Sequence, residues 1–317
     1  MTGIAPSTTR DAEKFNDPMV TLDGARRAHV GLKALRTLWI NTGTLCNLTC
    51  ESCYIDSGPR NDRLAYVDVD DVRPYLDEIE RHSLGTREIG FTGGEPFMNP
   101  GLTAILALCL DRDFNVLVLT NAMRPMMKCA DELAALNRRR GENLTLRVSL
   151  DHYSAARHEE LRGARSWQPT LDGITWLRDN GFRVHIAGRT CWDQNEAELR
   201  AGYGELFTRA GLSIDPHDPE SLVLFPEMDM EKDVPEISEQ CWDILGVAPD
   251  AMMCATSRMV VKRKGAARPA VLACTLLAYD PRFELGETLA EASSAVSLNH
   301  PHCAMFCVLG GGSCSGA

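Results

Sequence analysis

The chain has 317 residues, of which 44% are hydrophobic, as expected for a folded protein of one to three domains with a large core. Its formal net charge is -11, and basic residues occur only in short runs, so composition argues against a broad surface for nucleic acid or anionic membranes. No apolar stretch is long enough for a signal peptide or a membrane span. We therefore expect a cytoplasmic protein whose partners are neither nucleic acid nor membrane.

The chain opens with a polar arm, residues 1–34, in which a short helix around 22–30 is the only predicted element. From residue 35, short apolar runs rich in β-forming residues alternate with longer stretches of helical spacing. The predicted strands are 35–42, 87–91, 115–120, 145–150, 183–190 and 221–226. The predicted helices are 69–82, 102–111, 126–139, 170–180 and 196–210. This alternation implies parallel strands with right-handed crossovers, in either a partial barrel or an open doubly wound sheet.

A cysteine-rich loop follows the first predicted strand. It reads Cys46-Asn-Leu-Thr-Cys50-Glu-Ser-Cys53, so three thiols lie on one short segment. Three thiolates can converge on an iron–sulfur cluster and leave one position for a ligand that the protein does not supply. A closed zinc site is the structural alternative, but it needs a further ligand from elsewhere in the chain.

A second motif, Gly93-Gly94-Glu95-Pro96, follows the second predicted strand. Alone, such a tetrapeptide usually marks only a turn. About forty residues after the cysteine loop and on the next strand, however, it resembles the second motif of the radical S-adenosylmethionine (SAM) superfamily. The resemblance implies a 4Fe-4S cluster on the three cysteines, SAM bound to the fourth iron, and contacts from the 93–96 motif to the SAM amino group. It also favours the partial barrel over the open sheet.

Other polar residues stand at the carboxyl ends of the predicted strands, where parallel α/β folds collect their ligands. They are Thr120 and Asn121 after the third strand, Ser149 and Asp151 after the fourth, and Arg189 after the fifth. Ser149 and Asp151 are candidates for hydrogen bonds to the ribose hydroxyls of SAM. Arg189 offers a bidentate contact to the SAM carboxylate, and a structural ion pair is its alternative.

Three residues are candidates for acid–base work on a substrate. His152, Tyr153 and Glu227 would each face the mouth of the cleft in the predicted register. The alternatives are a loop histidine whose hydrogen bonds are satisfied and a tyrosine that only packs.

A second cysteine group lies in the C-terminal part of the chain, where the alternation has stopped. The runs 259–262 and 270–273 predict a hairpin between Cys254 and Cys274, with a short helix before it at 237–245 and another helix after it near 289–296. Cys303, Cys307 and Cys314 follow. This layout resembles the twitch domain, a shortened relative of the SPASM domain, and implies one auxiliary 4Fe-4S cluster. Five thiols for at most four positions leave one spare, and zinc is the alternative metal.

These features together predict the fold class α/β. We expect a partial (β/α)6 barrel of the radical SAM type over residues 35–232, preceded by the arm 1–34. A small C-terminal auxiliary-cluster domain, a β-hairpin plus a helix, is expected over residues 233–317.

The resemblance implies an enzyme in which one-electron reduction of the first cluster cleaves SAM, and the resulting 5'-deoxyadenosyl radical abstracts hydrogen from a substrate. We expect a small-molecule oxidation or rearrangement assisted by the auxiliary cluster, with an electron donor of the flavodoxin or ferredoxin type. The alternative is modification of a short peptide, although the arm shows no compact module for a leader peptide. A non-catalytic iron–sulfur carrier or regulator is the alternative of another class, and it leaves the strand-end motifs unexplained.

Overall fold

The computed structural model describes residues 13–51, 53–229 and 232–312. One sheet has nine strands in the order β10-β9-β8-β2-β3-β4-β5-β6-β7, and β1 pairs separately with β11. The strands are β1 (His29–Val30), β2 (Thr37–Asn41), β3 (Glu88–Thr92), β4 (Asn115–Thr120), β5 (Leu144–Ser149), β6 (Arg183–Arg189), β7 (Leu222–Phe225), β8 (Ser257–Val261), β9 (Ala270–Leu272), β10 (Glu284–Gly286) and β11 (Val296–Ser297). The helices are α1 (Val69–His82), α2 (Leu102–Asp111), α3 (Arg124–Lys128), α4 (Ala130–Arg140), α5 (Ala155–Arg162), α6 (Trp167–Asp179), α7 (Glu196–Ala210) and α8 (Cys241–Leu245).

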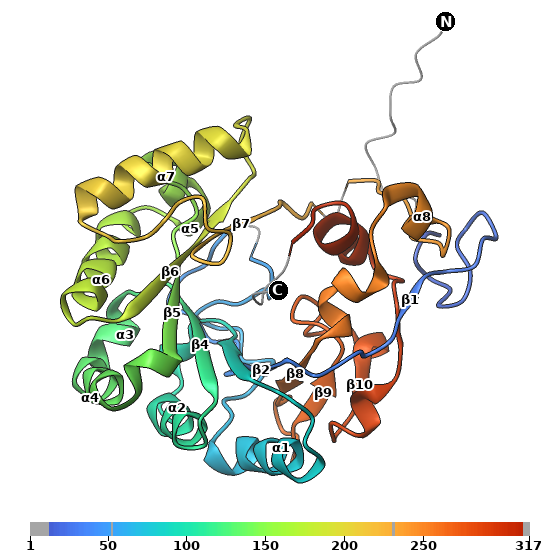
Figure 1. Cartoon of the computed structure of the whole chain (residues 1–317), viewed down its shortest axis with the longest axis horizontal. Coiled ribbons are helices and arrows are strands. Elements are labelled where there is room, and N and C mark those ends of the chain that lie inside the picture. The colour runs from blue at the N-terminus through green and yellow to red at the C-terminus, as the bar shows by residue number, and fades with distance from the viewer. Residues whose placement is uncertain (1–12, 52, 230–231, 313–317) are drawn as a thin grey trace, which may run out of the picture.

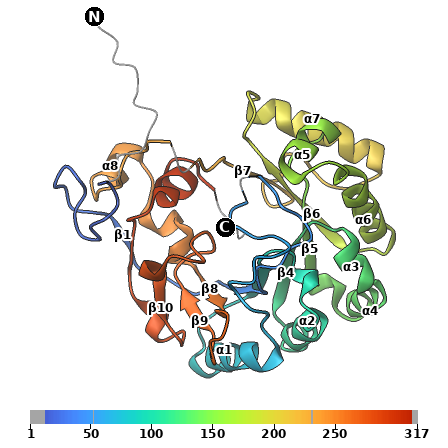
Figure 2. The ribbon, with the colours of Figure 1, turned by 180° about the vertical axis from the view of Figure 1, so that it is seen from behind.

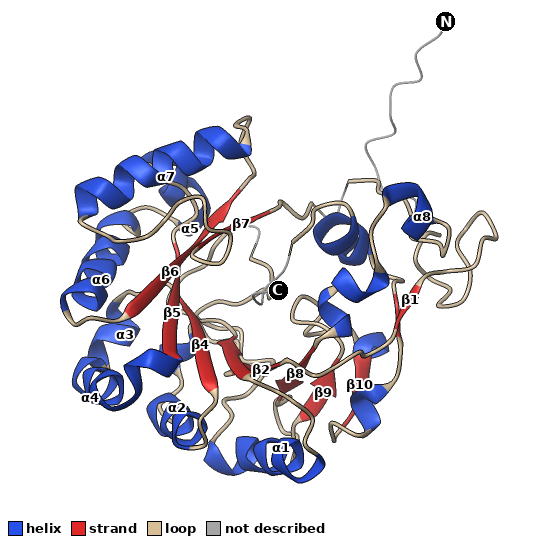
Figure 3. Cartoon of the chain, viewed as in Figure 1, coloured by secondary structure: helices blue, strands red, loops and turns tan. Residues whose placement is uncertain are grey.

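The strands β2 to β7 are parallel and lie side by side in chain order. The sheet curves with its strands inside and the helices α1, α2, α4, α6 and α7 outside, as Figure 1 and the secondary-structure colouring of Figure 3 show. It does not close, because β7 and β10 are its two edges. The predicted partial barrel is therefore confirmed, and its parallel strands end together at one rim.

Local signals explain why several helices match their predicted bounds. Asp68 and Asp71 form a capping box at the start of α1, and Asn195 and Glu198 form another at the start of α7. Gly211 ends α7 with a left-handed backbone, at φ 64°. The predicted helix 126–139 is instead two helices, because the chain leaves the helical conformation between α3 and α4. Helix α5 was not predicted, since His158 is its only buried residue and it has no apolar stripe.

The C-terminal hairpin extends the barrel sheet. Strand β8 pairs in parallel with β2, and β9 pairs with β8 in the antiparallel sense that the sequence predicted. The expected helix near 289–296 is wrong, because this stretch holds only a 3-10 turn, Glu291–Ser293, and strand β11. The guanidinium of Arg258 donates hydrogen bonds to the carbonyl oxygens of Ala292 and Ser294. In a helix these oxygens would instead accept from backbone N–H groups of the same helix. A π-helical segment at Cys303–Val308 is present instead.

The N-terminal arm lies against the C-terminal part of the chain, as the views from the front and from behind show (Figures 1 and 2). The predicted helix at 22–30 is wrong, since β1 ends this stretch and pairs with β11. The predicted helix 237–245 is confirmed only as the shorter α8. Within the described ranges, no helix is both long enough and apolar enough to span a membrane.

A buried ion pair holds the arm in place. The guanidinium of Arg27 is fully buried and donates to the backbone oxygens of Asp17, Val20 and Leu298 as well as to Glu236. Burial by itself would raise the pKa of Glu236, but hydrogen bonds from the Leu22 backbone N–H and from Arg27 hold it below its ordinary value of 4.5. The ionised carboxylate is therefore the form that the folded state prefers.

This ion pair predicts a loss of stability in acid. Because the folded pKa of Glu236 is lowered, its contribution is fully present above the unfolded pKa and disappears as the pH falls through the folded pKa. Glu236→Gln should therefore be less stable than the parent at neutral pH, and the gap should narrow towards about pH 3. Chemical denaturation across this range measures it, with Glu239→Gln as the exposed control. A gap that stays constant with pH would contradict the assignment.

Candidate functional site

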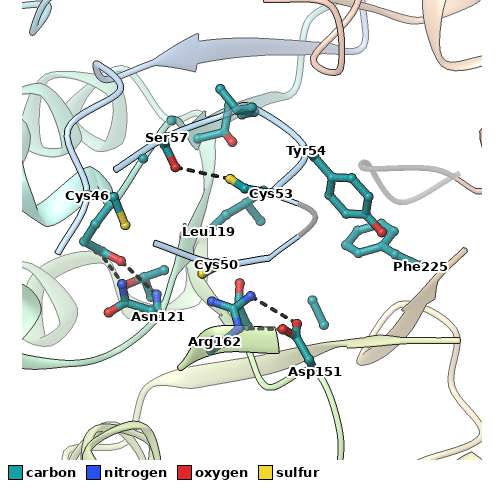
Figure 4. Close-up of a pocket in the computed structure, with 18 of the residues that line it drawn as sticks. Cys46, Cys50, Cys53, Tyr54, Ser57, Leu119, Asn121, Asp151, Arg162 and Phe225 are labelled. Carbon is teal, nitrogen blue, oxygen red and sulfur yellow. Dashed lines mark hydrogen bonds and ion pairs between the residues drawn. The ribbon is translucent and has the colours of Figure 1, made fainter. Parts of the chain in front are cut away.

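One cavity lies at the rim where the parallel strands end, and Figure 4 shows the residues around it. It is lined by the cysteine loop after β2, by the motif after β3, and by residues at the ends of β4 to β7. Eleven residues that the sequence singled out line it, namely Cys46, Cys50, Cys53, Gly93, Gly94, Glu95, Thr120, Asn121, Ser149, Asp151 and Arg189. Pro96 is buried at the start of the 3-10 turn Pro96–Met98 and is not part of the lining.

The glycine motif lies directly against the segment that leads to the first cysteine. The backbone N–H of Gly94 donates to the oxygen of Gly43 at 2.9 Å, and that of Glu95 donates to the oxygen of Leu45 at 3.1 Å. A Cβ atom on Gly94 would lie 2.3 Å from the same Leu45 oxygen. Only glycine permits this approach, so the motif sets the position from which the cysteine loop departs.

The thiols of the loop differ in their surroundings. Cys46 is buried, which raises the pKa of its thiol to about 12, and its sulfur accepts the Leu48 backbone N–H at 3.4 Å. The Cys53 sulfur and the Ser57 hydroxyl are 3.3 Å apart. The backbone N–H of Glu51 donates to the oxygen of Leu161 at the end of α5. These bonds hold the loop so that its three cysteines line one cavity, and metal binding would replace their protons.

The Glu95 carboxylate joins the ends of β3 and β4. Its Oε1 accepts the Thr120 hydroxyl at 2.8 Å and the Phe97 backbone N–H at 3.2 Å, and its Oε2 accepts the Asn121 backbone N–H at 2.8 Å. Burial raises the pKa of Glu95, although these hydrogen bonds oppose the shift. The carboxylate is therefore an oriented acceptor in the wall of the cavity.

Arg162 is a residue of the cavity that sequence reasoning missed. Its Nε and Nη2 donate to the two carboxylate oxygens of Asp151 at 2.8 and 3.1 Å (Figure 4). Burial alone would lower the pKa of Arg162, but Asp151 and the nearby Cys50 raise it. Its only sequence signal is its place in a polar helix shortly after Asp151. Because the pair is bidentate and largely buried, the carboxylate of Asp151 is engaged by the protein itself.

Arg189 approaches the cavity from β6. Its guanidinium carbon lies 4.5 Å from the centre of the Tyr54 ring. Its backbone N–H donates to the backbone carbonyl oxygen of Asp151 at 3.0 Å. The Tyr54 hydroxyl donates to the Pro226 oxygen at 2.8 Å. Arg162 and Arg189 thus bring two cations to a wall that also carries the three thiols.

The structure does not place the predicted acid–base residues at this cavity. The ring of His152 is buried, with its nitrogens within hydrogen-bond distance of Ser154 and Gln194, and Tyr153 packs against Gly202 of α7. Ser149 and Asp151 line the cavity, whereas His152 and Tyr153 contact Gln194, and Tyr153 also contacts α7. Glu227 is exposed beyond the end of β7. None of the three is among the residues that line the cavity, so their role in acid–base chemistry stays a prediction.

A family model described as the radical SAM superfamily matches residues 40–201, just over half of the chain. The chain belongs to the radical SAM superfamily. The matched stretch runs from the end of β2 into α7 and contains both motifs of the cavity and Arg162.

Curated relatives share parts of this radical SAM chain. GTP 3',8-cyclase 2 of Pseudomonas aeruginosa is 35% identical over 100 residues, which is 31% of this chain and 29% of the relative. The AdoMet-dependent heme synthase of Nitratidesulfovibrio vulgaris is 23% identical over 167 residues, 52% of this chain and 43% of the relative. The chain thus matches less than half the length of either relative.

Two solved radical SAM structures share the fold. SuiB of Streptococcus suis bound to S-adenosylmethionine superposes with a TM-score of 0.59 at 14% identity, covering 80% of this chain and 63% of SuiB. The enzyme anSMEcpe with bound AdoMet also has a TM-score of 0.59 at 14% identity, covering 81% of this chain and 76% of the other. At this identity the likeness establishes the α/β architecture.

The second cysteine group of this radical SAM protein lines a separate cavity. Cys254, Cys274, Cys303 and Cys307 surround it together with apolar side chains and His302. Burial raises the pKa of the Cys254 thiol to about 11 and that of Cys303 to about 12. Cys314 lies outside the described residues. Within the described part of the chain, no three His, Cys, Asp or Glu side chains are arranged to hold a single metal ion.

The Arg162–Asp151 pair predicts a measurable effect on folding. Arg162→Leu should lower the free energy of unfolding by about 3 kcal/mol, because it leaves the buried Asp151 carboxylate without its cation. The matched control is Arg157→Leu on the same helix, which removes an exposed pair with Glu160 and should cost less than about 1 kcal/mol. Urea denaturation of the radical SAM protein compares the two variants. Equal losses would show that the buried pair contributes nothing special.

Proposed function

We propose that this radical SAM protein is an enzyme that binds a 4Fe-4S cluster through Cys46, Cys50 and Cys53 and cleaves SAM reductively. The observation that carries the proposal is that three thiols from one loop share a cavity whose described lining contains no other cysteine and no histidine. Three thiolates leave one iron of such a cluster open to a small-molecule ligand. The residues present therefore fit the cluster and SAM together.

The polar residues of the cavity match the groups of SAM. The guanidinium of Arg162, oriented by Asp151, and that of Arg189 both line the cavity, where either could bind the SAM carboxylate. The Glu95 carboxylate is an acceptor for an amino group, and the Ser149 hydroxyl can bond a ribose hydroxyl. We assign Asp151 to orienting Arg162 rather than to the ribose, because both of its carboxylate oxygens accept from Arg162.

When bound, the cluster and SAM together supply a 5'-deoxyadenosyl radical for hydrogen abstraction. The protein's part is to orient SAM, to keep water from the reacting carbon and to place the substrate. The buried Cys46 and Glu95 form the enclosed side of the cavity. The proposal includes a small-molecule substrate that is oxidised or rearranged, and an electron donor of the flavodoxin or ferredoxin type.

The direct test is anaerobic reconstitution with iron and sulfide, followed by incubation with dithionite and SAM. We expect methionine and 5'-deoxyadenosine in equal amounts, measured by liquid chromatography with mass spectrometry. Protein that carries the cluster and binds SAM but makes no 5'-deoxyadenosine would overturn the proposed function. Omission of dithionite is the control, since cleavage needs one electron.

We also infer an auxiliary 4Fe-4S cluster of the twitch or SPASM type on Cys254, Cys274, Cys303 and Cys307. Its support is that four thiols far apart in sequence line one small apolar cavity, and thiolates are the ligands that iron–sulfur clusters prefer. Four cysteine ligands would leave no open iron. Such a cluster suits the role of electron acceptor in a net oxidation better than that of a substrate ligand.

Single serine variants test this ligand set. Cys303→Ser should lower the bound iron by about four atoms per chain, because the protein no longer retains the cluster when one of its thiolate ligands is missing. Cys314→Ser should leave the iron content unchanged. Metal analysis and Mössbauer spectroscopy measure both, and they also detect zinc. Loss of iron from Cys314→Ser would show that Cys314 is a ligand and that one of the four proposed cysteines is not.

A further inference from the structure

A third cavity lies between the two cysteine sites. It shares Tyr54, Leu119 and Phe225 with the cavity of the first site and Leu276 with that of the second. Its other walls include Trp39 on β2 and Phe306 in the π-helical segment. We call this cavity the connecting chamber. Because it shares walls with both sites, a group held there would be next to each of them.

The connecting chamber has an aromatic wall. The ring centres of Tyr54 and Phe225 are 6.0 Å apart, those of Tyr54 and Phe306 are 6.1 Å apart, and those of Phe225 and Phe306 are 5.6 Å apart. The hydroxyl of Tyr54 donates to a backbone oxygen, so the polar end of this ring already has a partner. Figure 4 shows the Tyr54 and Phe225 rings side by side at the edge of the first site.

No charged side chain is among the described residues that line the connecting chamber. Glu95, Arg162 and Arg189 line the first site but not the chamber. The guanidinium carbon of Arg189 lies 4.5 Å from the centre of the Tyr54 ring, which is part of the aromatic wall. The charge of Arg189 therefore lies at the boundary between the first site and the chamber, and the lining towards the second cysteine group, with Thr275, Leu276 and Phe306, carries no charge.

We infer that the connecting chamber, whose volume is about 60 Å³, receives a small, uncharged aliphatic part of the substrate. This inference rests on the proposed function, since that function makes the first site the source of the radical. Bringing an ionised group into an apolar cavity costs several kcal/mol unless a partner offsets the loss of water, and the chamber offers no charged partner. A carboxylate, phosphate or ammonium group of the substrate must therefore lie elsewhere.

The test uses three small probes of similar shape, which suit a cavity of about 60 Å³: 1-propanol, propanoate and propylammonium. Their dissociation constants are measured by ligand-observed NMR on the reconstituted full chain in the presence of SAM. We expect the neutral probe to bind at least about ten times more tightly than either ion, because neither charge finds a partner in the chamber. Equal or tighter binding of an ion would overturn the inference.

A matched pair of variants locates the binding. Leu119→Phe puts a larger side chain into the wall that the chamber shares with the first site, so binding is compared at saturating SAM. It should weaken the neutral probe at least about tenfold, because it fills the space that the probe needs. Leu224→Phe is the same change on β7, at a residue that does not line the chamber, and should leave binding unchanged. Equal effects of the two would overturn the inference. If Leu119→Phe lowers the iron content, Leu119→Ala replaces it, and the enlarged chamber must still bind the neutral probe.

The probe experiment tests the chamber, and the 5'-deoxyadenosine assay tests the proposed function, so a negative result in one leaves the other standing. If the protein makes 5'-deoxyadenosine but binds a charged probe more tightly, the proposed function stands and the inference about the chamber is wrong. Protein that binds the neutral probe at Leu119 but makes no 5'-deoxyadenosine would lose the proposed function, while the apolar site would stand.

Discussion

Replacing Cys46, Cys50 and Cys53 together by alanine is expected to abolish 5'-deoxyadenosine formation while leaving iron bound to the C-terminal cysteines. The two thiol groups line different cavities, separated by the aromatic wall of the connecting chamber. Removal of one set of ligands therefore does not remove the other. Bound iron should fall from about eight atoms to about four per chain, since each 4Fe-4S cluster holds four. Iron analysis, EPR of the reduced protein and chromatography of the products measure the three effects.

The control for this variant is Cys129→Ala. Cys129 lies between α3 and α4 and lines neither cysteine cavity, so its loss should change neither the iron content nor the product. Residual formation of 5'-deoxyadenosine by the triple variant would contradict the assignment of the first site. A triple variant with no iron–sulfur signal at all would mean that the auxiliary cluster does not exist.

Gly94→Ala should weaken SAM binding about 100-fold. The added Cβ would lie 2.3 Å from the backbone oxygen of Leu45 and 2.8 Å from that of Thr44, and neither atom can rotate away as a side chain can. The cysteine loop must then move relative to the motif. Overpacking of this kind costs up to about 3 kcal/mol, which corresponds to about two factors of ten if all of it falls on binding. Equilibrium dialysis with radiolabelled SAM on the reconstituted protein measures the change.

Gly31→Ala is the matched control, because a Cβ at that position meets nothing within 4 Å. It should leave SAM binding as it is. Thermal melting of both variants separates a local shift from general unfolding. If Gly94→Ala melts with the parent and binds SAM with unchanged affinity, then the contact between the motif and the loop does not position the ligand.

The core of the barrel could be predicted because its signals are local. Each parallel strand is a short apolar run, and helices such as α1 and α7 carry their own capping residues. The two motifs stand at strand ends, and in a parallel sheet all such ends meet at one rim. The shared cavity of the three loop cysteines with Gly93, Gly94 and Glu95 follows from that geometry. In the same way, Ser149, Asp151 and Arg189 reach the cavity because they lie at the carboxyl ends of β5 and β6.

The sequence did not reveal contacts that a residue makes with another element of the fold. For Asp151, the sequence indicated a place at a strand end, but it did not reveal that both carboxylate oxygens accept from Arg162. A helix was predicted near 289–296, but two carbonyl oxygens of this stretch accept hydrogen bonds from the guanidinium of Arg258. For His152 and Tyr153, the sequence did not reveal that the first bonds Gln194 and the second packs against Gly202 of α7.

The sequence by itself determined the alternation of strands and helices and the two motifs that identify the family, because spacing, caps and glycines act over a few residues. Only the tertiary structure decided that β8 joins β2, that the arm binds the C-terminal part through Arg27, and that four distant thiols surround one cavity. It also decided that an uncharged chamber separates the two cysteine sites. These features are contacts between segments far apart in the chain, so no local pattern records them.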